Sequence, residues 1–215
     1  MSEPAFLADP SRTATASTHD PIARLKTRPR KPGEASFFWH DTHFGCAAVK
    51  VLPGEYFVDR DNLMIVTTLG SCISACLWDG GARVGGMNHF MLPDGPSDHG
   101  RFGAYAMEVL INELMKQGAR RGALEAKVFG GAQVIAGMDS LNVGERNTRF
   151  IFDYLRTERI PVVSKDVLDI HPRKVCFLPA TGKAMVKRLA HAHEATQRER
   201  ELVAAPIAGG TVDLF

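Results

Sequence analysis

The chain has 215 residues, of which 45% are hydrophobic, so it can bury one core, and its length favours a single domain with tails. Its formal charge of +2 at pH 7 is close to neutral and the basic residues are spread along the chain, so the charge does not predict nucleic-acid binding. No apolar run approaches the roughly 20 residues of a membrane-spanning helix, and residues 1–35 lack the apolar segment of a secretory signal. We therefore expect a soluble, cytoplasmic protein without membrane insertion.

The composition divides the chain into three parts. Residues 1–40 are rich in Pro, Ser, Thr and Ala, and they are predicted to form a flexible N-terminal arm because they bury too little apolar surface to offset the entropy of ordering. Residues 41–190 carry the apolar patterns of a folded domain. Residues 191–215 are predicted to form a C-terminal helix, at about 191–203, followed by a Gly/Ala-rich tail.

In the folded part, alternating apolar runs bounded by Gly, Pro and Asp predict short strands. In chain order, strands are expected at 47–52, 55–58, 63–69, 73–78, 83–92, 124–129, 161–165, 174–177 and 183–189. Two main helices are expected at 103–117 and 143–158, because apolar residues recur there at spacings of three and four. Strands and helices do not alternate regularly, so the sequence predicts an α+β fold, a layered α/β sandwich with short mixed β-strands.

The cysteine pattern argues against disulfides and metal. The four cysteines are too few for a disulfide framework in a chain of this length and are predicted to be thiols in a reducing cytosol: Cys46, Cys72, Cys76 and Cys176. The spacing of Cys72 and Cys76 is at the edge of zinc-ligand patterns, but no second Cys/His pair completes a site. A nucleotide-binding loop and paired carboxylates are not evident either, so we expect no metal and no cofactor.

The segment Gly70-Ser71-Cys72 is the most informative in the sequence. A glycine before a Ser-Cys pair permits a sharp turn between two strands, which would expose the thiol and direct consecutive N–H groups toward a substrate oxygen. A thiol needs a base to become a good nucleophile, and the nearest candidate is His89, one strand and one turn later. The turn Asp79-Gly80-Gly81 predicts a hairpin that would bring Cys72 and His89 together. From the residues alone, a buried cysteine and a hydrogen-bonded core histidine remain the alternative.

Longer motifs surround these residues and continue downstream. They read TTLGSCISACLWD at 67–79, GGMNHFMLP at 85–93, GAYAM at 103–107, KVFGGA at 127–132, GERN at 144–147, RKV at 173–175 and TGK at 181–183. In combination they resemble the CheD family of chemoreceptor glutamine deamidases, over about residues 44–190. The segment Asp169-Ile170-His171-Pro172 departs from the Gly-rich turn of many members, which leaves the shape of that loop open.

The resemblance implies a cysteine amidase with Cys72 as the nucleophile and His89 as the general base. It also implies a threonine shortly before the cysteine that supports the pair; Thr67 is favoured, and the adjacent Thr68 is the alternative. In the implied reaction the thiolate attacks the carboxamide of a protein-bound glutamine, ammonia leaves, and water hydrolyses the thioester to leave glutamate. Because the substrate would be a side chain on a receptor helix, a shallow site is expected.

The implied substrates are methyl-accepting chemotaxis receptors, with receptor glutamyl methyl esters open to the same thioester route. CheD-like proteins also bind a CheC-type phosphatase, so a regulatory binding module is the alternative from a different class. Retention of both Cys72 and His89 favours an enzyme, because a pure binding module needs no such pair. A cysteine hydrolase with a different amide or ester substrate is a further alternative, which predicts cleavage or acyl transfer rather than ammonia release.

Overall fold

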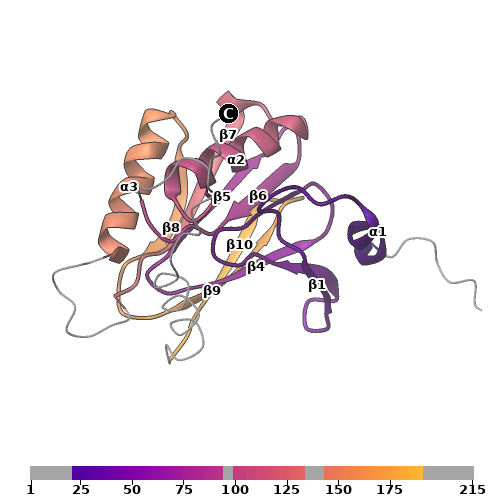
Figure 1. Cartoon of the computed structure of the whole chain (residues 1–215), viewed down its shortest axis with the longest axis horizontal. Coiled ribbons are helices and arrows are strands. Elements are labelled where there is room, and N and C mark those ends of the chain that lie inside the picture. The colour runs from indigo at the N-terminus through magenta and orange to yellow at the C-terminus, as the bar shows by residue number, and fades with distance from the viewer. Residues whose placement is uncertain (1–20, 94–98, 134–142, 191–215) are drawn as a thin grey trace, which may run out of the picture.

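The computed structural model describes residues 21–93, 99–133 and 143–190, whose strands form two five-stranded sheets (Figure 1). One sheet, here called the central sheet, has the order β3 (Tyr56–Asp59), β6 (Val84–Asn88), β5 (Ile73–Asp79), β7 (Leu124–Gly130) and β8 (Val162–Val167). The other, here called the outer sheet, has the order β1 (Phe37–Asp41), β2 (Cys46–Lys50), β4 (Met64–Leu69), β9 (Arg173–Leu178) and β10 (Lys183–Arg188). The helices are α1 (Pro21–Thr27), α2 (Gly103–Lys116) and α3 (Val143–Thr157), with a short 3-10 turn at Arg121–Ala123.

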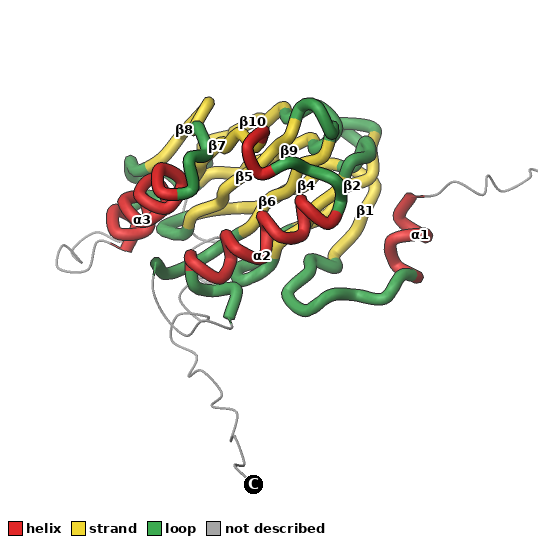
Figure 2. The backbone as a smooth tube through the Cα atoms, turned by 90° about the horizontal axis from the view of Figure 1, so that it is seen from above, coloured by secondary structure: helices red, strands yellow, loops and turns green. Residues whose placement is uncertain are grey.

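The central sheet is buried on both faces, because successive side chains of each strand enter two different hydrophobic cores. On one face, Ile73, Ala75 and Leu77 pack with apolar side chains of α2 and α3. On the other face, Cys72 and Cys76 pack with side chains of the outer sheet. Figure 2 shows α2 and α3 on the same side of the strands. The fold therefore has three layers, in the order helices, central sheet, outer sheet.

Strand directions within the two sheets are mixed. β5 and β6 form an antiparallel hairpin, whose register runs from Cys76 opposite Met87 to Asp79 opposite Val84. β2 pairs with β4, and β7 with β8, in parallel, whereas the remaining neighbours are antiparallel. The predicted layered α+β fold, with short strands of mixed direction and two main helices, is confirmed.

Residues 21–41 differ from the predicted flexible arm. Leu25 of α1 is buried in the core between the two sheets, and β1 pairs with β2 along its whole length, from Phe37 opposite Lys50 to Asp41 opposite Cys46. β1, which carries aromatic residues, is an additional edge strand of the outer sheet. It was not predicted, because the polar composition of the preceding segment indicated a flexible arm. Residues 1–20, and the predicted C-terminal helix and tail at 191–215, lie outside the described residues.

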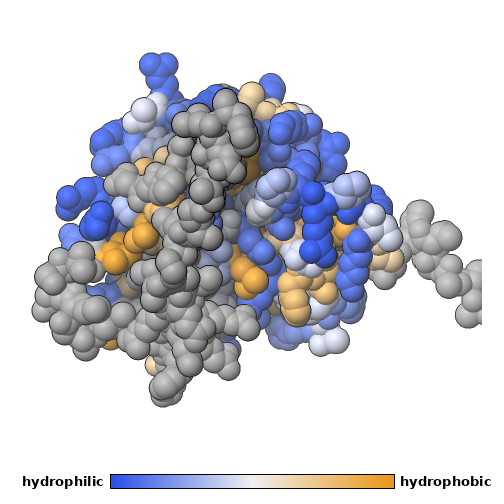
Figure 3. All heavy atoms as spheres, viewed as in Figure 1, coloured by the Kyte–Doolittle hydropathy of each residue, from blue (hydrophilic) through white to orange (hydrophobic). Residues whose placement is uncertain are grey.

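The helices of the described residues include no membrane-spanning helix. None of these helices combines the length and the apolar character that crossing a bilayer requires. On the face shown in Figure 3, hydrophilic side chains predominate and the apolar ones form separate groups.

Candidate active site

The candidate site lies at the open end of the β5–β6 hairpin, opposite its turn. The chain leaves the outer sheet at the end of β4, crosses through residues 70–72, and enters the central sheet at Ile73. Ile73 pairs with Phe90 through two backbone hydrogen bonds, with N–O distances of 3.1 and 3.0 Å. Since side chains alternate along a strand, Cys72 and His89, which precede these residues, both point toward the outer sheet. They are diagonal neighbours, a relation that places Cβ atoms roughly 7 Å apart.

Thr67 of the outer sheet contacts His89 across the gap between the sheets. Its Oγ1 lies 2.9 Å from His89 Nδ1, and it donates a hydrogen bond of 2.8 Å to the Val51 carbonyl. Because the only hydroxyl proton of Thr67 goes to Val51, the contact with His89 requires Nδ1 to donate, which assigns the Nδ1–H tautomer and leaves Nε2 as an acceptor. Thr68, the alternative from the sequence, lies one residue later on β4, so its side chain leaves the opposite face.

His89 is held as a neutral, buried imidazole. Burial lowers the pKa of His89 to about 3, so the ring carries no proton on Nε2 at neutral pH. In the part of the chain that the structure describes, His89 Nε2 has no hydrogen-bond partner. A neutral imidazole with an oriented Nδ1–H and an available Nε2 lone pair has the properties of a general base.

The backbone before and at Cys72 is fixed by its carbonyl groups. The carbonyl of Gly70 accepts from Ala132 N at 2.8 Å, and that of Cys72 accepts from Gly131 N at 2.8 Å. The carbonyl between them, of Ser71, accepts from Asn147 Nδ2 at 3.1 Å. Because C=O and N–H point in opposite directions across a trans peptide, the N–H of Ser71 points away from Ala132 N and the N–H of Cys72 points away from Asn147 Nδ2.

This close packing corrects one expectation from the sequence. The Gly70-Ser71-Cys72 turn was predicted to expose the thiol, but only 1% of Cys72 is exposed. The turn is covered because Gly130, with φ of +111°, approaches it so closely that a Cβ at that position would lie 2.1 Å from the Cys72 carbonyl oxygen. The sequence of this segment predicts a sharp turn but does not predict its exposure, because the residues that cover the turn come from distant parts of the chain.

Of the remaining cysteines, Cys76 and Cys176 are buried and Cys46 is half-buried. Cys76 is buried on the same face of β5 as Cys72, and burial raises the pKa of its thiol. Burial likewise raises the pKa of Cys176 and of Cys46. All four cysteines lie in the described part of the chain and none forms a disulfide. A raised pKa makes a thiolate scarce at neutral pH, so Cys76, Cys176 and Cys46 are poor nucleophiles.

The described residues contain no cluster of three or more His, Cys, Asp or Glu side chains that could hold a metal ion. Cys72 and Cys76, the pair with an approximate zinc-ligand spacing, lie four residues apart on one strand among apolar neighbours. Around His89 the structure places a neutral imidazole, the Thr67 hydroxyl that contacts it and the nearby Cys72.

The loop that departs from the family pattern adjoins the site. Leu168 and Asp169 both have positive φ, at +64° and +70°, and Gln133 N donates to the Asp169 carbonyl at 2.8 Å. The fully buried Arg173 closes the loop, because its guanidinium donates to Asp166 Oδ1 at 2.8 Å and to the Leu168 carbonyl at 2.5 Å. The loop thus keeps a tight left-handed turn without glycine, held by a buried arginine.

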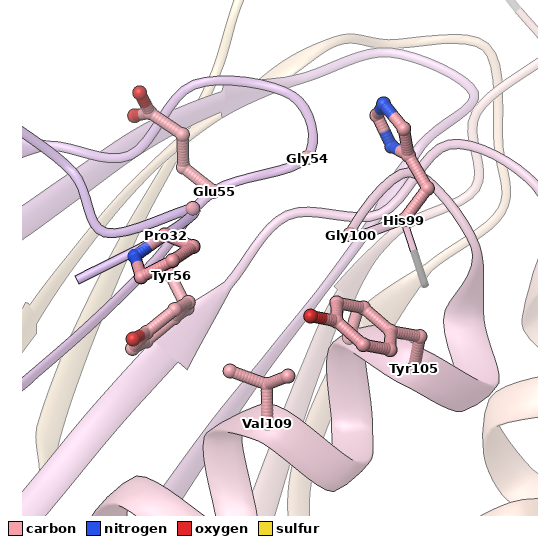
Figure 4. A pocket seen from close by; sticks show the side chains of 10 residues that line it. Pro32, Gly54, Glu55, Tyr56, His99, Gly100, Tyr105 and Val109 are labelled. Carbon is pink, nitrogen blue, oxygen red and sulfur yellow. The ribbon is translucent and has the colours of Figure 1, made fainter. Parts of the chain in front are cut away.

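A pocket of about 180 Å³ adjoins the main chain of His89. Two residues that line the pocket form hydrogen bonds with the main chain of His89. Gly54 N donates to the His89 carbonyl at 2.7 Å, and His89 N donates to the Glu55 carbonyl at 3.0 Å. Figure 4 shows the side chains around it, among them Glu55, Tyr56, His99, Tyr105 and Val109. Neither Cys72 nor His89 lines this pocket, so it is a recess beside the reacting groups rather than the place where they meet.

One polar residue at the site was given no role by the sequence. Asn147, in the first half of α3, is fully buried, and its Nδ2 donates to the carbonyls of Ser71 and Met91. The GERN motif that ends at this residue was part of the family resemblance. Its separation from Cys72 in the chain left no local signal for a contact.

Comparisons with known proteins show the family to which the chain belongs. The sequence model of CheD, described as CheD chemotactic sensory transduction, matches residues 91–188. The chain is 65% identical to a probable chemoreceptor glutamine deamidase CheD 1 of Albidiferax ferrireducens, over 90% of this chain and 86% of that protein. It is 50% identical to a probable chemoreceptor glutamine deamidase CheD of Thiobacillus denitrificans (84% and 96% covered). It is 49% identical to a CheD 1 of Shewanella oneidensis (82% and 92% covered).

Proposed function

Because this chain belongs to the CheD family, we infer that it is a protein-glutamine glutaminase, a hydrolase that converts glutamine side chains of chemoreceptors to glutamate in chemotaxis. The substrates are chemoreceptors, as the names of the relatives state for those proteins. Residues 41–190 are proposed as the catalytic domain, with Cys72 as nucleophile, His89 as general base and Thr67 as the residue that orients the base.

One observation carries the assignment of roles. The Thr67 hydroxyl is 2.9 Å from His89 Nδ1 and gives its own proton to Val51, so the His89 Nε2 lone pair is left to act on the side of the ring remote from Thr67. Cys72 lies on the same face of the hairpin as His89, as the diagonal neighbour. A neutral base fixed by a third group, close to a thiol, is the arrangement that activates a cysteine nucleophile.

The first half of the reaction forms a thioester. His89 Nε2 takes the Cys72 thiol proton, and the sulfur forms a bond to the carboxamide carbon of glutamine while the C=O electron pair moves to oxygen. The resulting tetrahedral oxyanion collapses, the C–N bond breaks, and the proton on His89 is transferred to the departing nitrogen, which leaves as ammonia. The peptide N–H groups of Ser71 and Cys72 are proposed to stabilise the oxyanion, a contribution commonly worth ~3 kcal/mol per donor.

The second half regenerates the enzyme. His89 Nε2 removes a proton from water, whose oxygen attacks the thioester carbon, and the C–S bond breaks as the carbonyl re-forms. The product side chain is a glutamate carboxylate, and Cys72 recovers its proton from His89. The same second half would release glutamate from a methyl ester substrate, with methanol leaving in the first half in place of ammonia.

The finer assignments of partners follow the family resemblance. Methyl-accepting chemotaxis receptors are proposed as the substrates, in the cytoplasm, and a CheC-type phosphatase is proposed as a second partner. A purely regulatory binding role is less favoured, because a buried Thr67–His89 pair beside a cysteine serves no evident purpose in a binding surface.

Intact-mass analysis of receptor cytoplasmic fragments tests the function directly. Each deamidation replaces NH2 by OH and adds about one dalton, and ammonia accumulates in equal amount. The matched control is Cys72→Ala, which should give neither change. Fragments that keep their mass with the wild-type enzyme, or that are cleaved instead, would contradict the proposal and point to a different amide or ester substrate.

A further inference from the structure

We propose that Asn147 is a positioning residue, which clamps the turn that carries Cys72 to the strand that carries His89. The inference rests on the proposed catalytic roles of these two residues and adds a third element, α3, to the site. Asn147 acts through its neighbours and does not touch the substrate.

The need for a clamp arises because the hairpin ladder stops at the site. Ile73 and Phe90 form its outermost rung, with two hydrogen bonds. The next hydrogen-bonded rung of an antiparallel ladder would join Ser71 to Leu92. Leu92 is bonded elsewhere instead, since its N donates to the Arg101 carbonyl at 3.1 Å and its carbonyl accepts from Gly103 N at 2.8 Å. The two chains therefore separate beside the nucleophile.

Asn147 fills the place of the missing rung. Its Nδ2 donates to the Ser71 carbonyl at 3.1 Å and to the Met91 carbonyl at 2.8 Å, so each of its two hydrogens is bonded to one of the two diverging chains. One acceptor lies directly before Cys72, and the other lies two residues after His89. Beyond the Ile73–Phe90 rung, the turn before Cys72 and the chain after His89 are thereby joined through a single amide group.

The orientation of this amide follows from its neighbours. With the oxygen and nitrogen exchanged, Oδ1 of Asn147 would face two carbonyl oxygens, which repel it, so only the nitrogen fits between Ser71 and Met91. Oδ1 is buried and has no hydrogen-bond partner among the described residues. A buried acceptor left unpaired destabilises the fold, and such groups are typical of functional sites.

Helix α3 holds Asn147 in place rigidly enough for this role. Gly144 packs against Gly131 so closely that a Cβ at position 144 would lie 2.4 Å from the Gly131 carbonyl oxygen. Three residues beyond Asn147 on α3, the Phe150 ring contacts the Phe90 ring edge-on, with centroids 5.7 Å apart. The first part of α3 is thus packed on the segment that covers Cys72 and on the residue that follows His89.

Replacing the amide tests the clamp. Asn147→Ala leaves the turn and the strand unjoined beyond the Ile73–Phe90 rung, and misplacement of reacting groups by about 1 Å costs on the order of 100-fold in rate. We expect kcat for a receptor fragment to fall by about 10- to 100-fold with little change in KM, and alkylation of Cys72 by iodoacetamide to change in rate. The matched control is Thr148→Ala, the next residue of α3, whose hydroxyl donates to the Gly144 carbonyl within the same helix.

A nearly isosteric variant provides a signature that a purely structural role would not produce. In Asn147→Asp, an ionised carboxylate would face two carbonyl oxygens, whereas the protonated acid can donate one hydrogen bond. The activity of Asn147→Asp relative to wild type should therefore fall as pH rises, over a range set by a carboxyl pKa that burial raises. This variant also tests the clamp if Asn147→Ala does not fold.

The outcomes separate the clamp from the proposed function. Wild-type kcat in Asn147→Ala, or a constant ratio of Asn147→Asp to wild-type activity across pH, would overturn the clamp while leaving the Cys72 and His89 assignments intact. Full activity of Cys72→Ala, by contrast, would overturn the catalytic roles themselves. A drop in kcat that is confined to the Asn147 variants, with Thr148→Ala unaffected, supports the clamp.

Discussion

The two ends of the β5–β6 hairpin each bury a titratable side chain, Asp79 and His89, and they pair it to very different extents. At the closed end, the buried Asp79 carboxylate accepts three backbone hydrogen bonds, from Gly81 at 2.8 Å, Ala82 at 3.0 Å and Arg120 at 2.9 Å. At the open end, His89 Nε2 and Asn147 Oδ1 are buried and have no hydrogen-bond partner within the described residues.

This difference separates stability from chemistry within one hairpin. Buried polar atoms are nearly always paired in folded proteins, because an unpaired one carries a desolvation cost of about 1–3 kcal/mol. The Asp79 carboxylate obeys that rule, although Nε1 of the neighbouring Trp78 is also buried without a hydrogen-bond partner among the described residues. The open end violates it where the sequence predicts the reacting groups, and the open end is therefore where substitutions should change activity more than stability.

The largest expected effect is at the nucleophile. Cys72→Ala should lower kcat at least about 1000-fold, because it removes the atom that forms the thioester. Cys76→Ala is the matched control, since Cys76 is as deeply buried as Cys72 and packs in the same core. It should keep nearly full kcat. Ammonia release from receptor fragments measures both, and an active Cys72→Ala would refute the assignment.

The second effect is at the base. His89→Gln keeps a buried polar side chain but removes the basic Nε2, and kcat should fall by about 100- to 10,000-fold, the range for loss of general acid–base catalysis. His99→Gln, in the wall of the neighbouring pocket, should stay within a few-fold of wild type. Similar activities of the two variants would show that His89 is a structural core histidine.

His89→Gln should also change how the stability of the fold depends on pH. The folded state holds the pKa of His89 at about 3, against about 6.5 in the unfolded chain, so between these values the unfolded state binds more protons. Stability should therefore be fully present above pH 6.5 and fall by up to about 1.4 kcal/mol per unit as pH drops toward 4. In urea unfolding at pH 7, 6 and 5, the free energy of unfolding should fall less with decreasing pH in His89→Gln than in the wild type. Equal falls in the two proteins would contradict a buried neutral imidazole.

A smaller effect is expected at the supporting hydroxyl. Thr67→Val keeps the shape of the side chain but cannot accept the His89 Nδ1–H, so the ring loses its orientation and kcat should fall by about 10-fold, the lower end of what a misplaced base costs. Thr68→Val, on the opposite face of β4, is the control and should have no comparable effect. The reverse order of the two variants would move the supporting role to Thr68.

The sequence predicted the hairpin but not the surroundings of its open end. The turn at 79–81 and the alternating runs beside it predict the β5–β6 pairing, because these signals are local. Thr67 and Thr68 differ in role because only one of them lies on the face of β4 that meets the central sheet. The sequence of the two adjacent threonines does not show which face that is. The burial of Cys72 and the contact of Asn147 depend on segments 58 or more residues away in the chain, so no local pattern encodes them.

The smallest expected effect on activity is at the closed end, where the largest loss of stability should occur. Burial raises the pKa of Asp79, but the hydrogen bonds from Arg120, Ala82 and Gly81 outweigh it and hold the pKa below its usual range. The carboxylate therefore stabilises the fold above the unfolded pKa of about 3.9, and this contribution is lost as pH falls through the lower folded value.

Asp79→Asn removes one of the two acceptor oxygens and the charge, and should lower the free energy of unfolding at pH 7 by about 1.5–3 kcal/mol, the range for hydrogen bonds to a charged group. The kcat of Asp79→Asn should stay within about twofold of wild type. The open end of the hairpin is separated from Asp79 by the length of β5, and its hydrogen bonds are unaffected by the substitution. Asp153→Asn is the control for lost charge, since its pair with Arg156 is exposed and surface pairs contribute about 0–1 kcal/mol. If Asp79→Asn lost activity while its urea midpoint stayed unchanged, the two ends of the hairpin would not be the separate regions described above.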